Sequence, residues 1–301
     1  MSEQAKGNLP TSVAEKPLEQ LFGEMRSKLH RYCARMTGSV IDGEDVVQDA
    51  LVKAIEAAPS AGPIANPEGW LFRIAHNAAL DFLRRRARER TLEFTEDTDM
   101  VVETRSAIED REIVAASLRT FMRLPLSQRS SVILADVLGN SLRETAEIVD
   151  GNVLAIKGAL QRGRERLRGF AAEDDNGPVP ELDEPDRQRL KTYVDLFNAH
   201  DFDAIKAMLA EDIRFEVVNK VRRDGKSALP YFTNYGARPH WRLLAGFVDG
   251  RPAALVYDGE DPDERIKYFV LLEWTGDQVT SIRDFVFARY AMEGADIRVM
   301  D

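Results

Sequence analysis

The sequence has a single cysteine, Cys33, and only four histidines, which are scattered along the chain: His30, His76, His200 and His240. One thiol excludes an intrachain disulfide, and the spacing of these residues gives no set of metal ligands. We therefore expect no metal and no cofactor. The chain also lacks an apolar run of the ~20 residues that span a bilayer, and its N-terminus lacks the apolar core of a signal peptide. These absences predict a cytoplasmic protein with no membrane partner.

An overall basic charge is missing too, since the net charge is −10, which at first argues against a nucleic-acid partner. The charge is unevenly placed, however. Residues 1–172 hold 24 Lys and Arg against 25 Asp and Glu, whereas residues 173–301 hold 17 against 26. Basic residues concentrate in segments 84–90 and 157–168. Local basic surface matters more for phosphate binding than the total charge does, so both segments are candidate DNA-binding surfaces.

Segment 141–168 has the pattern of a helix-turn-helix. Ser141 and Glu144 have capping-box spacing. Asp150-Gly151-Asn152 predicts the turn, with Gly151 at positive φ and Asn152 capping the second helix. The expected buried side of that helix is formed by Val153, Ile156, Leu160 and Leu167. A separate polar and basic stripe is formed by Lys157, Gln161, Arg164 and Arg168. The same pattern also fits an ordinary helical hairpin with a solvated charged face, so other parts of the chain must decide.

Periodicity predicts two all-α helical domains in the first part of the chain. A flexible N-terminus (1–16) precedes the first domain (17–90), which has a break at 38–43, a helix at 44–57, a loop at 59–67 and a long helix that ends in the arginines. An acidic linker (91–112) leads to the second domain (113–170). There we expect helices at 113–124 and 127–138 before the helix-turn-helix, with Gly139 as a helix cap.

After a second linker (171–186), the pattern in residues 187–301 changes to an α+β type. Apolar spacing predicts an amphipathic helix around 190–197 and a short helix at 203–209. Alternating residues predict strands at 213–217, 266–274 and 279–290, and Asp249-Gly250 predicts a hairpin between 241–248 and 252–257. Helices followed by strands favour an α+β domain with a curved antiparallel sheet.

The order of three motifs resembles the extracytoplasmic-function (ECF) group of bacterial sigma-70 factors. Residues 42–55, DGEDVVQDALVKAI, are similar to the helix that binds the clamp of core RNA polymerase. Residues 66–88, NPEGWLFRIAHNAALDFLRRRAR, are similar to the promoter-melting and minus-ten segment. Residues 124–168 resemble the minus-thirty-five domain. The resemblance covers about residues 18–170. It implies a non-enzymatic sigma factor that binds core RNA polymerase and promoter DNA and directs transcription initiation.

The resemblance also implies roles for individual residues. Core polymerase would be bound by Asp45, Gln48 and Asp49. The minus-ten element would be bound by Asn77, Asp81, Arg84, Arg85 and Arg88, and a flipped base would enter a pocket near the 58–66 loop. In the minus-thirty-five helix, base contacts would come from Lys157 and Gln161, and phosphate contacts from Arg162, Arg164 and Arg168. Ala155, Gly158 and Ala159 depart from the family pattern, which predicts weaker or more permissive reading of the upstream element.

Residues 187–301 resemble the SnoaL-like, nuclear-transport-factor-2-like fold, in which helices wrap a curved sheet; VDGRPAALVYD (248–258) contributes to this resemblance. We expect this domain to regulate the sigma factor in cis, through a small-molecule ligand or a regulatory protein, or by presenting its acidic surface to the basic helices as a DNA mimic. One alternative is a small-molecule enzyme, with candidate pocket residues Arg214, His240, Tyr257, Asp258 and Asp284. Another is a DNA-binding regulator that uses only the helix-turn-helix.

Overall fold

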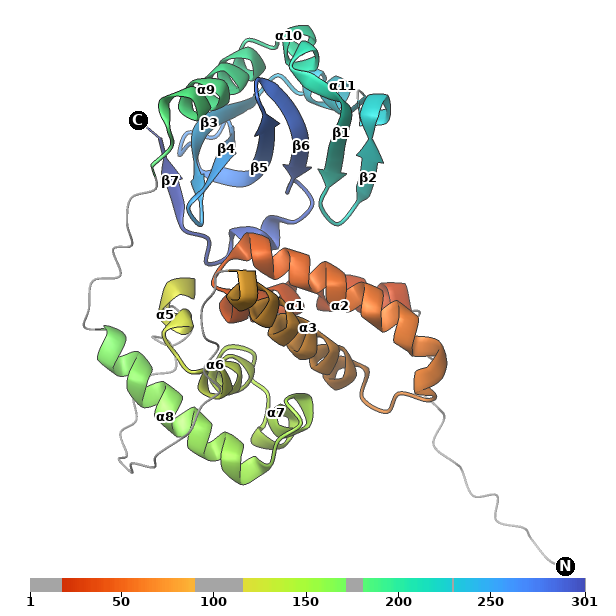
Figure 1. Cartoon of the computed structure of the whole chain (residues 1–301), viewed down its shortest axis with the longest axis vertical. Helices are drawn as coiled ribbons and strands as arrows, with labels where there is room; N and C mark the ends of the chain where they lie inside the picture. Colours follow the sequence, from red (N-terminus) through yellow and green to blue (C-terminus); the bar gives the residue numbers. More distant parts are fainter. Residues whose placement is uncertain (1–17, 90–115, 172–180, 229, 301) are drawn as a thin grey trace, which may run out of the picture.

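A computed structural model describes residues 18–89, 116–171, 181–228 and 230–300. An all-helical part (residues 18–171, the helical part) is followed by a domain of helices and one sheet (residues 181–300, the sheet domain), as Figure 1 shows. The predicted fold class is therefore confirmed. The predicted N-terminus (1–16), the linker 91–112 and residues 172–180 of the second linker lie outside the described residues. None of the described helices is long and apolar enough to cross a membrane.

The helical part begins with a three-helix bundle: α1 (Leu18–Thr37), α2 (Val40–Ala61) and α3 (Pro67–Glu89). The predicted break at 38–43 is present but shorter, covering only Gly38 and Ser39. The Ser39 hydroxyl accepts hydrogen bonds from the backbone amides at the start of α2, so that helix begins at Val40. Gly43 lies inside α2, where a Cβ would come within 2.6 Å of the Ala34 backbone of α1. This glycine permits a close helix crossing. Pro59, predicted in a loop, also lies inside α2.

The second group of helices contains the helix-turn-helix. It comprises α5 (Leu118–Met122), α6 (Leu126–Val132) with its π-helical continuation (Ile133–Val137), α7 (Leu142–Ile148) and α8 (Val153–Ala171). The helix predicted at 113–124 is shorter than expected, because Ser117 caps α5, and residues 113–115 are outside the described part. The predicted helix at 127–138 is the α6–π-helix unit, and Gly139 ends it at φ 77°.

The sequence correctly predicts two details of the turn between α7 and α8 and misses two others. The Ser141–Glu144 capping box is present, and Asn152 Oδ1 accepts a hydrogen bond from the Ala155 amide at 2.8 Å. The left-handed residue is Asp150 (φ 57°), not Gly151. Val153 is 47% exposed and so does not belong to the buried side of α8.

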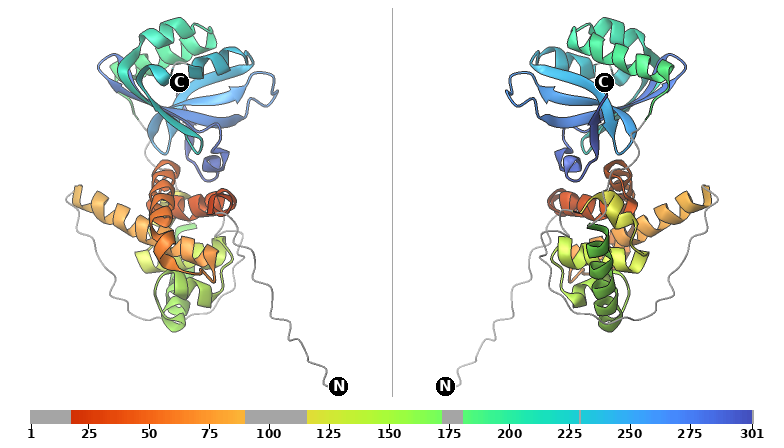
Figure 2. Two further views of the ribbon diagram at one scale, coloured as in Figure 1. Left: turned by 90° about the vertical axis from the view of Figure 1, so that its right-hand side faces the viewer. Right: turned by 90° about the vertical axis from the view of Figure 1, so that its left-hand side faces the viewer.

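The two predicted helical domains share one hydrophobic core. Buried residues of α1 to α3, such as Leu29 and Leu71, belong to the same cluster as Phe121, Ile133 and Ile148. Arg129 of α6 is buried and donates a hydrogen bond to the Met36 carbonyl at the end of α1 (2.8 Å). The views in Figures 1 and 2 place α7 and α8 on the side of the bundle away from the sheet domain.

The sheet domain opens with α9 (Glu184–Asn198) and α10 (Phe202–Ala207). Its seven strands have the order β2-β1-β6-β5-β4-β3-β7. Their bounds are β1 Leu209–Val217, β2 Val221–Asp224, β3 Trp241–Val248, β4 Arg251–Asp258, β5 Ile266–Thr275, β6 Gln278–Asp284 and β7 Ile297–Val299. The Asp249-Gly250 hairpin is confirmed. The sequence predicts an antiparallel sheet, but β1 and β6 pair in parallel, so the sheet is mixed.

Several elements of the sheet domain have no counterpart in the sequence-based prediction. They are β2, β7, two 3₁₀ helices (Gly225–Ala228 and η3, Arg289–Met292) and α11 (Pro230–Gly236). The strand predicted at 279–290 ends at Asp284. The chain that follows it, with η3, lies on the side of the sheet domain that faces the helical part.

The two faces of the sheet have different partners. One face packs on α9 and α11 around residues such as Tyr193, Tyr235 and Tyr268. The other face contributes Leu255, Phe269 and Phe285 to a cluster that also contains Val40 and Ile41 of α2 and Leu118 of α5. Apolar burial of this kind is the main source of stabilisation in a protein interface, and here it joins the sheet domain to the helical part.

Candidate protein and nucleic-acid interfaces

Two of the three residues predicted to bind polymerase contact the sheet domain. Asp45 Oδ1 accepts a charged hydrogen bond from Arg283 Nη2 at 2.6 Å. Gln48 Nε2 donates to Glu216 Oε1 at 2.8 Å, and Arg283 Nε donates to the other oxygen of Glu216 at 3.0 Å. Asp49 is exposed. The outer face of α2 is therefore partly covered by the chain's own C-terminal domain, 238 positions away in sequence.

A second contact at the start of α2 is almost fully buried. The apolar pattern of residues 44–57 predicts that Glu44 points outward. Instead, Glu44 is 0% exposed and forms an ion pair with Arg26 of α1. Tyr290 of η3 donates to Glu44 Oε2 at 3.0 Å and accepts from Arg26 Nε at 2.7 Å. Burial raises the pKa of the Glu44 carboxyl, and the neighbouring Arg26 opposes that rise. The prediction failed here because the group that covers Glu44 comes from the other domain.

Charged pairs surround this buried contact and join the same two parts. Asp42 accepts from Arg86 of α3 and from Arg251 of β4. Asp249 at the β3–β4 hairpin accepts from the Val40 amide (2.6 Å), and Arg31 pairs with Glu293 (2.8 Å). The acidic sheet domain therefore docks on the acidic start of α2 and supplies its own arginines there. This differs from the expectation that it would cover basic helices as a DNA mimic.

Beyond the covered part, α2 exposes apolar side chains that the sequence prediction did not single out. Val52 is 54% exposed and Ile55 is 58% exposed, one turn apart and close to Asp49. Exposed apolar residues beside charged ones are typical of protein-binding surfaces. The signal was available, because both residues fall on the outward side of the α2 pattern.

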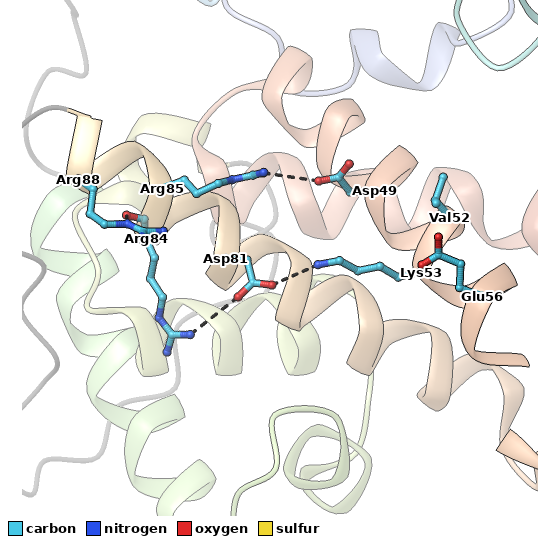
Figure 3. Close-up of a pocket in the computed structure, with 8 residues that line it drawn as sticks. All are labelled: Asp49, Val52, Lys53, Glu56, Asp81, Arg84, Arg85 and Arg88. Carbon is cyan, nitrogen blue, oxygen red and sulfur yellow. Dashed lines mark hydrogen bonds and ion pairs between the residues drawn. The ribbon is translucent and has the colours of Figure 1, made fainter. Parts of the chain in front are cut away.

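The predicted minus-ten residues form one exposed stripe on α3. Asn77, Asp81, Arg84 and Arg88 occur every three or four residues and are all exposed. Asp81, Arg84 and Arg88 line a hollow between α2 and α3, shown in Figure 3. There Asp81 pairs with Lys53 (3.1 Å) and Arg84 (3.9 Å). Arg85 pairs with Asp49 at 3.5 Å. Exposed pairs such as these contribute little stability, so their arginines can exchange partners readily.

The loop predicted to receive a flipped base faces α7. A groove at this loop is lined by Ile64, Asn66 and Trp70 on one side and by Glu144, Glu147 and Ile148 on the other. Arg73 of α3 donates two hydrogen bonds to the Glu147 carbonyl, at 3.0 and 2.7 Å. The helix-turn-helix therefore closes one wall of this groove.

On α8, the predicted DNA-binding residues divide into two groups. Lys157 is exposed, and Gln161, Arg162 and Arg168 are partly buried. Arg164, predicted to hold a phosphate, instead binds Asp136, whose side chain is 3% exposed, with Nε to Oδ2 at 2.9 Å. Arg164 in the second half of α8 is thus tied to its own domain, whereas Lys157 in the first half faces solvent.

The five candidate pocket residues of the sheet domain do not meet around one site. Asp284 is buried and accepts hydrogen bonds from Tyr231 (2.8 Å), Tyr235 (2.7 Å) and the Val286 amide (2.8 Å). Arg214 lies on the opposite face of the sheet, because Ile213 and Phe215 beside it face the interior. Tyr257 and Asp258 are at the end of β4, beside the start of β3, where the His240 ring packs at a tilt on that of Trp241 (ring centroids 5.1 Å apart).

Comparison with known proteins decides among the functions considered. The Sigma-70 region 2 family model matches residues 21–89. The ECF RNA polymerase sigma factor SigM of Mycobacterium tuberculosis is 34% identical over 149 residues, which are 50% of this chain and 74% of SigM. The chain belongs to the ECF sigma factor family.

A second ECF sigma factor, SigG of M. tuberculosis, is 27% identical over 266 residues. That match spans 77% of this chain and 71% of SigG, and so extends past α8 into the sheet domain. The crystal structure of the M. tuberculosis ECF sigma factor SigJ, 21% identical, covers 89% of this chain and 95% of its own with a TM-score of 0.35. Membership of the ECF family confirms the predicted sigma factor role and does not favour the alternatives.

Proposed function

We propose that this ECF sigma factor has two states, open and closed. The closed state is the arrangement described above, in which the sheet domain packs on α2, and the sheet domain holds the chain in it. The contact between Asp45 and Arg283 carries the proposal. Family resemblance implies that Asp45 and Gln48 bind the polymerase clamp. Here the two side chains are instead bound by Arg283 and Glu216 of the sheet domain. Core polymerase and the sheet domain would therefore compete for the same face of α2.

Promoter geometry supports the same proposal. Promoter elements centred near minus ten and minus thirty-five are separated by about 85 Å of straight B-DNA, at 3.4 Å per base pair. The segments implied in reading them, α3 and α8, belong to units that share one hydrophobic core and are joined by the Arg73–Glu147 contact. Units packed this closely cannot reach both elements at once. Promoter binding therefore requires the second unit to leave the first.

The groove at the 62–66 loop gives a third argument. A flipped minus-ten base would need access to Asn66 and its neighbours, and α7 forms the opposite wall of that groove. Opening would uncover the loop and separate the two promoter-binding units in one step. In the open state, α2 would bind core RNA polymerase, while α3 and α8 would bind promoter DNA.

We assign the sheet domain a regulatory role rather than a catalytic one. Its buried carboxylate, Asp284, already has three hydrogen-bond donors, two of them tyrosine hydroxyls within a packed aromatic core. A buried polar group satisfied in this way contributes to the architecture of the domain. A small molecule or protein that binds the sheet domain more tightly in the open state would shift the chain toward activity.

The proposal is tested by the affinity of the full chain for core RNA polymerase. Arg283→Ala removes the partner of Asp45 without altering the helical part. Because Asp45 is 42% exposed, the closed state should lose about 1 kcal/mol, which corresponds to roughly fivefold tighter polymerase binding.

A matched control is Arg265→Ala, which removes an exposed arginine that pairs with Asp261 and Asp263 in the β4–β5 connection. That connection follows the end of β4 opposite to the hairpin that contacts α2. The control should bind polymerase like the wild type. Polymerase binding by Arg283→Ala that is unchanged or weaker would contradict the closed-state proposal.

A further inference from the structure

We infer that Leu154 at the start of α8 makes this sigma factor read thymine in its upstream promoter element, by contact with the 5-methyl group. The inference rests on the proposed binding of promoter DNA by α8. Leu154 is 80% exposed, more than any other large apolar residue recorded as exposed in the described part of the chain. It is not among the residues that the sequence pattern assigned to DNA.

Leu154 shares a helix face with the polar residues already implied in DNA contact. Lys157 and Gln161 follow it at i+3 and i+7, and this face is opposite to the buried stripe that contains Ile156 and Leu160. Leu154 therefore points in the direction in which a groove-facing helix presents its side chains. Residues in the first turns of such a helix contact base edges.

Two arginines in the second half of α8 are bound within their own domain, so base contacts would come from the first turns. Arg164 is held by Asp136, and Arg166 Nη1 donates to Gln128 Oε1 at 3.1 Å. Neither arginine can reach a base without losing a contact inside its own domain. Leu154, Val153 and Ala155 are exposed in the first turn of the helix.

Gly158 lies on the same face, and because it has no side chain a base edge can come close to Leu154. A Cβ at this position would lie 3.3 Å from Arg162 Nη1, so the guanidinium of Arg162 folds back over the glycine toward the start of α8. The sequence departures at Ala155 and Gly158 thus leave an apolar, small-residue surface around Leu154, with cationic groups beside it.

Thymine fits this surface better than any other base. Its 5-methyl group is the apolar feature that the major groove presents, and apolar side chains recognise it by contact. That contact does not require the polar side-chain atoms of Lys157 or Gln161. Removing one buried methyl group should weaken binding about fourfold.

The test uses holoenzyme reconstituted from the full chain and core RNA polymerase. Duplexes retained from a pool with a randomised upstream segment are sequenced, and each enriched thymine is then replaced by deoxyuridine, which removes only the 5-methyl group. For the wild type, we expect about fourfold weaker binding at one or two thymine positions. Leu154→Ala should bind the thymine duplex about as weakly as the wild type binds the deoxyuridine duplex, and should not distinguish the two.

The matched control is Phe287→Ala, which removes an exposed apolar side chain (54%) from the sheet domain and should keep the thymine preference. Retained duplexes that bind equally well with deoxyuridine would overturn this inference and leave the proposed function intact. Equal binding together with poorer holoenzyme assembly by Leu154→Ala would also overturn it, by assigning Leu154 to polymerase. A holoenzyme that retains no duplex would overturn the proposed function and this inference with it.

Discussion

At the scale of single residues, Arg129 shows how one side chain can join two units. Arg129 is 7% exposed, and its guanidinium donates to the carbonyls of Met36, Met122 and Leu124 at 2.8–3.0 Å. Burial lowers the pKa of Arg129 to about 10, which still leaves it charged at neutral pH. Nη1 also contacts the Met122 sulfur at 3.2 Å. A buried cation with no carboxylate partner among these contacts is costly unless its hydrogen bonds form together.

We expect Arg129→Ala to lower the free energy of unfolding by roughly 2–4 kcal/mol, because two buried carbonyls and one part-buried carbonyl lose a donor. Urea denaturation followed by far-UV circular dichroism measures this change. Arg129→Lys keeps the charge but cannot span all three carbonyls, so it should give an intermediate loss. A loss below about 0.5 kcal/mol for the alanine variant would show that water or other donors replace the guanidinium.

Single residues also show which features can be predicted from the sequence and which cannot. The capping box at Ser141 and the cap at Asn152 were predictable, because each depends on neighbours within three positions. The burial of Glu44 was not predictable, because Tyr290 covers it from 246 positions away. Local patterns report which face a helix buries against its own domain and contain no signal for a second domain that docks on the outer face.

At the scale of elements, the crossing of α1 and α2 sets the position of the α2 face that we propose binds polymerase. A Cβ on Gly43 would lie 2.6 Å from both the Cα and the N of Ala34, which is far inside any normal contact distance. Composition rules treat such a glycine as a helix break, and this is why the start of α2 was misplaced in the sequence-based prediction. Its function is close packing between two helices.

Gly43→Ala should therefore push α2 away from α1 and lower the free energy of unfolding by roughly 1–3 kcal/mol, the usual cost of overpacking. Gly23→Ala on α1 is the matched control, because a Cβ there meets nothing within 4 Å. That change should raise stability by about 0.5–1 kcal/mol through helix propensity. Thermal unfolding of both variants compares the two effects, and equal behaviour would contradict the packing argument.

Sheet elements were predictable to different degrees for a similar physical reason. The β3–β4 hairpin follows from Asp249-Gly250 and two alternating flanks, and it was found with nearly correct bounds. The parallel pairing of β1 with β6 was missed, because the pairing of strands distant in sequence leaves no periodic signal in either strand. The candidate pocket failed for the same reason, since its five residues were chosen without knowledge of which face each would occupy.

At the scale of the whole molecule, acid should destabilise the folded chain through two buried histidines. Burial lowers the pKa of His30 to about 4 and that of His76 to about 4. His30 lies between the domains, with its Nε2 2.8 Å from the Val40 carbonyl and its ring 5.1 Å from that of Tyr290. Nearby Arg26 and Arg35 oppose its protonation, and Glu293 favours it.

A histidine whose pKa is depressed by folding contributes stability above its unfolded pKa of about 6.5 and loses it as the pH falls toward 4. Each group should make the free energy of unfolding fall by up to about 1.4 kcal/mol per pH unit across that window. Urea denaturation at several pH values measures the slope. His30→Gln and His76→Gln should each flatten it, and a wild-type slope near zero would show that both histidines become exposed before they titrate.

The sheet domain and the helix face it covers belong to one polypeptide, which would fix the stoichiometry of the proposed inhibition. A separate inhibitor is released by dilution, or when its synthesis lags behind that of its target. A tethered one stays at an effective concentration in the millimolar range, whatever the number of molecules in the cell. The active fraction should then be independent of expression level. It would be set by how strongly core polymerase, promoter DNA and any ligand of the sheet domain together favour the open state.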